Sequence, residues 1–334
     1  MYSGGGQLFS FISRLDKQFL AVTWETHGNG ATHPDEFLSK QRDAWGKFWS
    51  PEDPHLIYKV AQNYKDLREA VLEQANFVKF DEDKLNKALK GYMKDTLGGD
   101  FWKPSELRFL PSPAKINISN ACEFAINAVA MPHQLLISLN ALLGKPGNGC
   151  RTVCKTPVLY RMILRVDESV RKWEIENAQA YDTAQVGSSA LLAALKRNLK
   201  AEVAKWLGQE FASIFNDYEK FFDTLDLNVL MEEAIHSGFP LDQLAFSLQQ
   251  HMAPRVLQSC GVSSQPININ RSILAGCKNS VPFTRTYSQR DMIRLTEEYP
   301  EGNTQLYVDD TPVHAVGESK QDVIDSLLPV MKSF

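Results

Sequence analysis

Two adjacent carboxylates near the C-terminal end of the chain, Asp309 and Asp310, are the residues whose type and spacing most directly suggest chemistry. They follow the strand-forming residues 306–308, and apolar residues resume after Thr311 and Pro312, which predicts a β-hairpin with the acids at its tip. Adjacent carboxylates repel each other and raise each other's proton affinity unless a cation lies between them. A divalent metal ion is one such cation. Asp-Asp beside Thr-Pro is also ordinary turn chemistry, so the pair alone leaves both interpretations open.

A third carboxylate, Asp217, ends a mainly apolar run over residues 211–217 that predicts a buried strand. An acid in that position either has a function or caps the next element, and a cap contributes about 1 kcal/mol. Capping stays an open interpretation for Asp217, as it does for Asp223 and Asp226.

Positive charge is concentrated between residues 145 and 172, which contain seven Lys or Arg and only two acids, in a chain whose formal net charge is −4. Lys145 and Arg151 flank a Gly-rich turn that predicts the tip of a second β-hairpin. There they are suited to a phosphate clamp, because a guanidinium can bind two oxygens at once. The spacing of a phosphate-binding loop is absent, and a solvated hairpin and helix face is the alternative.

The composition is that of a soluble globular protein, with 43% hydrophobic and 23% charged residues. The net charge gives no general basic field for nucleic acid, so any polyanion site must be local. Five cysteines without paired metal spacing predict buried or free thiols in a reducing compartment. The N-terminus is too short and charged for a signal peptide, and residues 124–144 make a poor membrane span. We therefore expect an intracellular protein that does not enter a membrane.

The coarse pattern mixes helices with a few strands and predicts an α+β fold. Apolar positions spaced at three and four residues predict helix over residues 56–90, and residues 1–90 are interpreted as a helical N-terminal extension. A Ser-containing turn at residues 187–190 begins a predicted helix with a leucine stripe. Residues 238–256 are also expected to be helical, and a further helix is expected over residues 281–299.

Taken in chain order, these pieces resemble the reverse transcriptase domain of LINE-type (non-LTR) retrotransposons, from about residue 96 to the end. The stretch from Asp217 to Asp223 is similar to the first catalytic motif of that family, Gly276 with Ser280 to the second, and residues 307–310 to the third. Residues 98–102 and the Gly-rich hairpin resemble the upstream fingers motifs. The chain departs from the family pattern at Ala275, where Gln is usual, and at Val281, where Pro is usual.

The resemblance implies the fingers and palm of a right-hand polymerase, with an antiparallel sheet packed on helices. It divides the chain into the extension at 1–90, a fingers-like region at 91–205 and an incomplete palm at 206–334. Because the sequence stops 24 residues after Asp310, we expect the thumb to be lacking.

The implied chemistry is RNA-directed DNA polymerisation, in which a primer 3′-hydroxyl attacks the α-phosphate of a deoxynucleoside triphosphate. Two Mg²⁺ ions, or Mn²⁺ in their place, would be held by Asp217 and Asp309 with support from Asp310. The partners implied are an RNA template, a DNA or RNA primer and deoxynucleoside triphosphates; the oligomeric state is left open. The implied nucleotide-binding residues are Lys145, Arg151, Lys220, Phe222 and Gly276.

Phe222 matches the position that rejects the ribose 2′-hydroxyl, and Gly276 would let the backbone approach the templating pair. Phe221 stands where the family has a small residue, and it would crowd the nucleotide sugar unless the backbone adjusts. Two alternatives remain: a truncated, inactive retroelement remnant that at most binds RNA, and a nucleotide cyclase built on the same palm layout. A nuclear location is expected only from the family's habit of copying into chromosomes.

Overall fold

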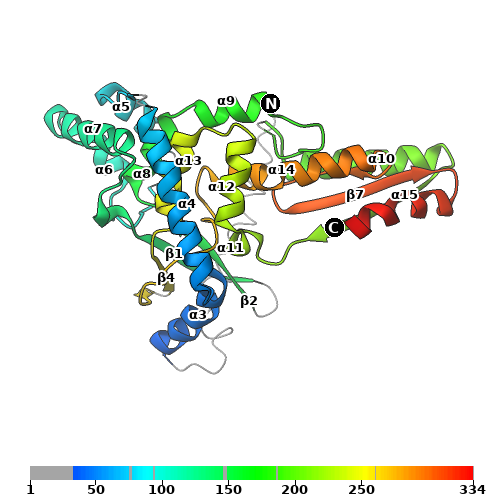
Figure 1. The fold of residues 1–334 in the computed structure, drawn as a ribbon, viewed down its shortest axis with the longest axis horizontal. Coiled ribbons are helices and arrows are strands. Elements are labelled where there is room, and N and C mark those ends of the chain that lie inside the picture. The colour runs from blue at the N-terminus through cyan, green and yellow to red at the C-terminus, as the bar shows by residue number, and fades with distance from the viewer. Residues whose placement is uncertain are drawn as a thin grey trace. The chain divides into compact units, whose positions relative to one another are not determined.

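The computed structural model describes residues 33–74, 77–92, 95–145, 149–185, 187–259 and 261–333, without the side chain of Lys145. The expectations for residues 1–32, for the side chain of Lys145 and for the turn at residues 146–148 lie outside this part. The chain divides into two compact units, which we describe separately (Figure 1). The first comprises residues 1–167, 222–227 and 245–280, and the second comprises the remainder.

The first unit combines helices with a four-stranded mixed sheet. Its helices are α3 (Pro34–Trp49), α4 (Pro54–Glu73), α5 (Glu82–Lys90), α6 (Pro104–Arg108), α7 (Ser112–Asn127), the 3₁₀ turn η1 (His133–Leu135), α8 (Val158–Val166), and parts of α11 (Phe221–Thr224) and α13 (Leu241–His251). Its strands are β1 (Ser138–Lys145), β2 (Gly149–Lys155), β4 (Arg255–Ser259) and β5 (Val262–Ser263), in the order β2-β1-β4-β5. β1 pairs with β2 antiparallel and with β4 parallel.

Helix α3 covers one face of this sheet and belongs to its core. Trp45 and Trp49 pack in one cluster with Leu142 of β1 and Leu257 of β4. The indole Nε1 of Trp49 donates a hydrogen bond to Asp223 Oδ1 at 2.7 Å. The predicted N-terminal extension therefore supplies, in its described part, structural contacts of the first unit.

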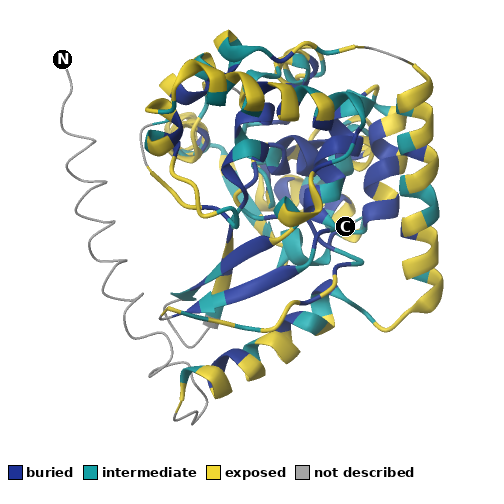
Figure 2. Ribbon diagram, turned by 90° about the vertical axis from the view of Figure 1, so that its left-hand side faces the viewer, coloured by how far each residue is buried: buried dark blue, intermediate teal, exposed yellow. Residues whose placement is uncertain are grey.

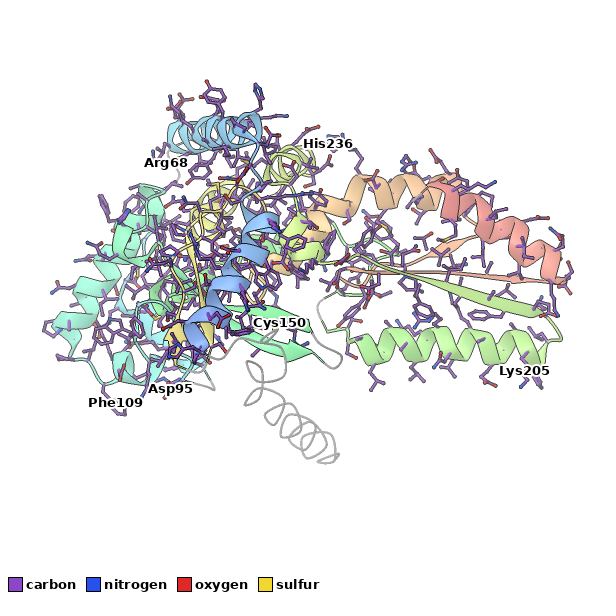
Figure 3. The ribbon with its side chains drawn as sticks, turned by 90° about the horizontal axis from the view of Figure 1, so that it is seen from below. Arg68, Asp95, Phe109, Cys150, Lys205 and His236 are labelled. Atoms are coloured by element: carbon purple, nitrogen blue, oxygen red, sulfur yellow. The ribbon has the colours of Figure 1, made fainter. Side chains whose placement is uncertain are left out.

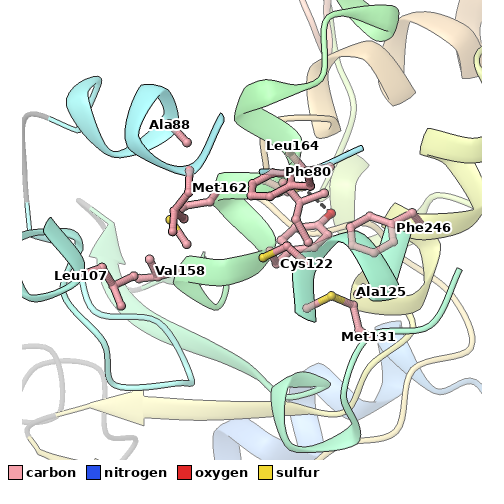
Figure 4. Packing of buried hydrophobic residues seen from close by; sticks show 14 of the residues in the cluster. Phe80, Ala88, Leu107, Cys122, Ala125, Met131, Val158, Met162, Leu164 and Phe246 are labelled. Atoms are coloured by element: carbon pink, nitrogen blue, oxygen red, sulfur yellow. Dashed lines mark hydrogen bonds between the residues drawn. The ribbon is translucent and has the colours of Figure 1, made fainter. Parts of the chain in front are cut away.

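A second, larger core lies between the helices of this unit (Figure 4). Tyr160 and Met162 of α8 are fully buried there, and the Tyr160 ring stacks on Phe246 of α13 with centroids 5.9 Å apart. Asp100 fixes the start of α8, because its Oδ2 accepts a hydrogen bond from Val158 N at 2.6 Å. Figure 2 shows the buried residues on the inward faces of the helices and strands.

The second unit contains a three-stranded antiparallel sheet, in the order β3-β7-β6, between helices. Its elements are α9 (Ser169–Glu176), α10 (Ala190–Trp206), β3 (Glu210–Asp217), α12 (Leu227–His236), α14 (Ser280–Glu298), β6 (Asn303–Thr304), β7 (Asp310–Gly317) and α15 (Lys320–Ser333). Ala212 and Ile214 of β3 pack with Val313 and Ala315 of β7 on one face of the sheet, against apolar residues of α15. Figure 3 shows the strands running between α15 and α10, the helix that carries Lys205.

A buried ion-pair group holds α14 to the loop before α10. The Arg285 guanidinium binds both Asp182 and Glu174, and Arg285 and Asp182 are buried. Its Nη2 also donates to the carbonyl of Ala184 at 3.2 Å. Asp182 also forms an isolated parallel β-bridge with Leu306. The ion-pair group therefore helps to position the segment that leads into the Asp309-Asp310 turn.

The α+β class predicted from sequence is confirmed, although the sheet of the first unit is mixed. The helix expected over residues 238–256 is wrong at its end: α13 stops at His251, and residues 255–259 form β4, whose parallel partner β1 is distant in sequence. The boundaries at 90 and 205 stay predictions. None of the helices in the described ranges combines the length and apolar composition needed to cross a membrane.

His251 makes the stability of the first unit depend on pH. It is buried in α13, its Nδ1 accepts the Leu274 N–H at 3.2 Å, and burial lowers the pKa of the imidazole to about 3, helped by the Arg255 charge. Below pH 6.5, the ordinary pKa of a histidine side chain, His251 therefore binds a proton more readily in the unfolded chain than in the folded one. We expect this residue to lower the free energy of unfolding by about 1.4 kcal/mol per pH unit as the pH falls from 6.5 toward 3.

Denaturant titrations across this pH range measure the effect. His251→Asn keeps an acceptor for the Leu274 N–H and removes the titrating group, so its slope should be flatter. Equal slopes for the variant and the natural chain would contradict the assignment.

Candidate active site

The pairing of β3 with β7 places two of the predicted acids side by side. In the antiparallel register Asp217 lies directly opposite Asp310, and both residues are exposed. Opposed residues of an antiparallel pair have Cα atoms about 4.5–5.5 Å apart and side chains on the same face of the sheet. Like charges in that position destabilise the pairing, so a cation held between the carboxylates would relieve a real repulsion.

Asp309 occupies a different position, at the tip of the turn. The Tyr307 N–H donates to the Asp310 carbonyl at 2.8 Å and the Asp310 N–H returns to the Tyr307 carbonyl at 3.0 Å, which leaves Val308 and Asp309 as the two turn residues. Thr311 and Pro312, expected in the turn, are part of β7. The register therefore makes Asp310, rather than Asp309, the residue facing Asp217.

The turn contains backbone strain at Val308, whose φ is +63°. A two-residue hairpin turn of this kind favours Gly, Asn or Asp, because a Cβ in the left-handed region costs roughly 1–2 kcal/mol. A β-branched residue is an outlier there. Such strain persists where the surroundings fix the backbone, and it is concentrated at functional sites.

A cavity of about 220 Å³ lies beside this turn within the second unit. The ring of Phe221 is 5.5 Å from that of Tyr218 and 6.1 Å from that of Tyr287, measured between centroids. Burial raises the pKa of Tyr218. The lining residues are Tyr218, Phe221, Tyr287, Ser288, Asp291, Met292, Arg294, Leu295, Leu306, Val308, Asp309, Thr311 and Ser333.

Among the predicted nucleotide-binding residues, Lys220 belongs to the second unit and the other described ones to the first. Lys220 has φ +53°, so the chain bends sharply three residues after Asp217. Residues 222 and 225 are bound to the segment before Gly276: the Ile273 N–H donates to the Phe222 carbonyl at 2.9 Å, and the Ser272 N–H to the Leu225 carbonyl at 2.9 Å. Phe222 and Gly276 are thus brought to one loop system.

Position 276 requires glycine because its backbone lies very close to the backbone of β2. Its φ is +107°, and a Cβ built on it would lie 3.0 Å from the Cys154 carbonyl oxygen. Cys154 N donates to the Ala275 carbonyl at 2.8 Å, so Ala275 contributes through its backbone. Ser280, the other residue of this motif, donates its hydroxyl to the Leu274 carbonyl and closes the loop.

Arg151 is exposed on β2. Lys155, on the same strand, was not among the predicted site residues. Strand residues two and four apart share a face, so Val153 and Lys155 lie on the Arg151 side. Lys155 Nζ is 3.5 Å from Gln258 Oε1 of β4. Arg151 and Lys155 thus lie along one strand face. The alternation of side chains along a strand that follows the Gly-rich turn was the sequence signal that could have found Lys155.

Other cations of the basic segment have structural partners. Arg161 and Arg165 both lie over the ring of Tyr92. Arg161 donates to the Thr96 carbonyl at 2.6 Å, and Arg165 to the Gly91 carbonyl at 2.7 Å. The local excess of charge counted in the sequence therefore overstates what is available to a ligand.

No family model matched the chain, and no curated protein matched its sequence. The function is therefore inferred from side chains, their geometry and the resemblance in motif order.

The facing carboxylates suit magnesium as a donor set. Among the described residues, no group of three or more His, Cys, Asp or Glu side chains is arranged to hold a metal ion. Mg²⁺ is commonly bound through one or two carboxylates, with water and substrate phosphate oxygens completing the shell. Asp217 and Asp310, both exposed and opposed, meet that requirement without a third protein ligand.

Gly276→Ala tests the close approach at β2. We expect the free energy of unfolding to fall by about 1–3 kcal/mol, because the new Cβ meets the Cys154 carbonyl at an unfavourable φ. Gly46→Ala, in α3 with open space around the new Cβ, is the control and should be neutral or stabilising by up to ~1 kcal/mol. Chemical denaturation measures both, and equal effects would show that Gly276 has no special role.

Mg²⁺-dependent stability tests the opposed carboxylates. Without metal, Asp310→Asn should raise the free energy of unfolding by about 0.2–1 kcal/mol, because a like-charge pair is removed. With millimolar Mg²⁺ the natural chain should gain stability by mass action, and the variant should gain less. Glu301→Gln, a change at an exposed acid, is the control; equal Mg²⁺ responses in all three proteins would rule out the site.

Proposed function

We propose that this chain is the fingers and palm of an RNA-directed DNA polymerase related to LINE-type reverse transcriptases. The observation that carries the proposal is the cross-strand pair Asp217–Asp310, next to a strained turn that presents Asp309. The order of Asp217, Gly276 and the turn along the chain, and the loop system that joins Phe222 to the Gly276 segment, support the same function.

In this proposal Asp217 and Asp310 hold divalent cations at the end of the β3–β7 pair. Mg²⁺, or Mn²⁺ in its place, would supply charge neutralisation for the phosphates and activate the primer hydroxyl. Asp217 and Asp310 fix the position of the cation between the strands, and Asp309 extends the anionic surface toward the cavity. The strained turn keeps these oxygens in place before substrate arrives, which limits reorganisation during the reaction.

The reaction is a nucleotidyl transfer. The 3′-oxygen of a DNA or RNA primer forms a bond to the α-phosphorus of a deoxynucleoside triphosphate, and the bond from that phosphorus to the leaving pyrophosphate breaks. The hydroxyl proton passes to solvent or to a nearby base. An RNA template selects the nucleotide by base pairing.

The nucleotide-binding roles in the proposal come from the family resemblance. Arg151 binds triphosphate oxygens with a bidentate guanidinium, with Lys155 four residues further along the same strand face and Lys145 on the same hairpin. Phe222 rejects the ribose 2′-hydroxyl, and Gly276 keeps its loop close to β2. Lys220 adds positive charge after Asp217. A chain with these roles works where RNA and primers are available, and the family resemblance suggests the nucleus.

Template-directed incorporation on a primed RNA with Mg²⁺ tests this function. We expect deoxynucleotide incorporation by the natural chain and near-background incorporation by Asp217→Asn and Asp310→Asn. Arg151→Ala should lower kcat/KM for the nucleotide by about 10–100-fold, since a charge-assisted hydrogen bond contributes roughly 1.5–3 kcal/mol. Arg42→Ala, an α3 substitution outside the candidate site, is the control.

Two outcomes oppose the proposal. Incorporation that survives Asp217→Asn and Asp310→Asn would remove the carboxylates from the reaction. Binding of RNA without incorporation, by protein shown to be folded, would favour an inactive retroelement remnant.

A further inference from the structure

The two opposed carboxylates lie on the side of the β3–β7 pair that α10 covers. Alternate residues of a strand share a face of the sheet. Phe215 and Pro312 form the cross-strand pair two residues before Asp217 and two after Asp310, so they lie on the same face as the acids. The apolar residues that pack against α15 alternate with these and belong to the opposite face. Side chains of α10 that reach the sheet are therefore on the side of the acid pair.

Arg197 of α10 brings a positive charge to this side. Its guanidinium carbon lies 4.5 Å from the centroid of the Phe215 ring, which neighbours the acid pair along β3. Arg197 is half-buried and Phe215 is 62% exposed, so a small solute can reach both. A guanidinium stacked on a ring keeps its N–H groups for hydrogen bonds in its own plane. No carboxylate in the described part of the chain forms an ion pair with Arg197.

Lys200, the next cation along this side of α10, already has partners. Its Nζ lies 3.2 Å from His314 Nε2 and 3.4 Å from Asn303 Oδ1. Burial, together with the charges of Lys200 and Arg197, lowers the pKa of His314 to about 4, so the ring is uncharged at neutral pH. Within this face, the positive charge that a ligand can use is therefore at Arg197, beside the acids.

The spacing between Arg197 and the acids suits a phosphate ligand that also contacts a cation. Two residues along an antiparallel strand span roughly 6.8 Å, which separates the pair at Phe215 from the pair at Asp217. A Mg²⁺ ion puts a carboxylate oxygen and a phosphate oxygen up to about 4 Å apart. A guanidinium binds a phosphate oxygen at about 2.8 Å. A diphosphate group can therefore contact the cation and Arg197 at the same time.

A nucleic-acid backbone fits this face less well. Its phosphates carry one charge each and follow one another along the strand, so it calls for a row of available cations. Here the cation beyond Arg197 is Lys200, which is bound to Asn303 and His314. One guanidinium beside one cation site matches a compact, highly charged anion better.

We propose that Arg197 binds the diphosphate group shared by a nucleoside triphosphate and inorganic pyrophosphate, on the side of the sheet where Asp217 and Asp310 hold the cation. This role rests on the proposed function, because the cation is what brings the diphosphate to the acids. The negative charge of the ligand is then neutralised by the cation on one side and by the guanidinium on the other. Helix α10 thereby becomes part of the site, through a residue that the family resemblance does not assign.

Titration calorimetry of the full chain with inorganic pyrophosphate, and separately with a deoxynucleoside triphosphate, each in the presence of Mg²⁺, tests this role. Arg197→Ala should weaken both ligands by the same factor, about 10–100-fold, because both lose a charge-assisted hydrogen bond to the group that they share. Arg197→Lys keeps the charge and loses the grip on two oxygens, so it should weaken them less.

Lys205→Ala is the matched control, a change at an exposed cation of the same helix, at the end that leads into the start of β3 (Figure 3). It should leave both affinities unchanged. Circular dichroism should show that the variants are folded, and Mn²⁺ electron paramagnetic resonance should show that the Arg197 variants still bind the cation. A purely structural role of Arg197 would instead disturb the acid pair and lower Mn²⁺ binding.

Three results would overturn the role of Arg197. Equal pyrophosphate affinities of the natural chain and Arg197→Ala, with Mn²⁺ bound by both, would remove Arg197 and leave the proposed function standing. No bound Mn²⁺ in the natural chain would remove the proposed function and the role of Arg197 together. An Arg197→Ala effect on single-stranded RNA binding in EDTA as large as that on pyrophosphate would show that the guanidinium contacts a nucleic-acid backbone.

Discussion

The pairing of β3 with β7 is the interaction on which the candidate site depends. Its register brings Asp217 opposite Asp310 and puts the apolar residues of both strands against α15. A shift of one residue would turn Ile214 and Val313 away from that core, so the burial of apolar side chains holds two like charges together. The stability of the α15 face thereby offsets the repulsion at the end of the strands.

In the first unit, backbone contacts do the corresponding positioning. The segment at residues 272–276 is bound on one side to residues 222 and 225 and on the other to β2, where Gly276 approaches Cys154. Trp49 joins this system through Asp223 and through its ring, which lies 4.7 Å from the buried Arg255 guanidinium. Helix α3 of the predicted N-terminal extension therefore supports, through Trp49, the loops at residues 222–225 and 272–276.

The local sequence pattern was enough to predict single helices and strands. It did not predict which distant segments pair with each other. The strand ending at Asp217 and the helix over residues 281–299 are confirmed, because their apolar residues follow one period throughout. The identity of the acid facing Asp217 depends on register, which a hairpin's own sequence does not specify. β4 was missed because its partner β1 is more than a hundred residues away. The leucine stripe of α10 was visible, but its outward direction follows from small residues on the other face.

The central claim is that the Asp217–Asp310 pair holds divalent cations. Electron paramagnetic resonance of Mn²⁺ titrated into the full chain tests this most directly, because free and protein-bound Mn²⁺ give different signals. We predict bound Mn²⁺ in the natural chain, competition by Mg²⁺, and loss of the bound signal in Asp217→Asn and in Asp310→Asn. A bound signal that is the same in both variants, or no bound Mn²⁺ in the natural chain at millimolar metal, would contradict the claim.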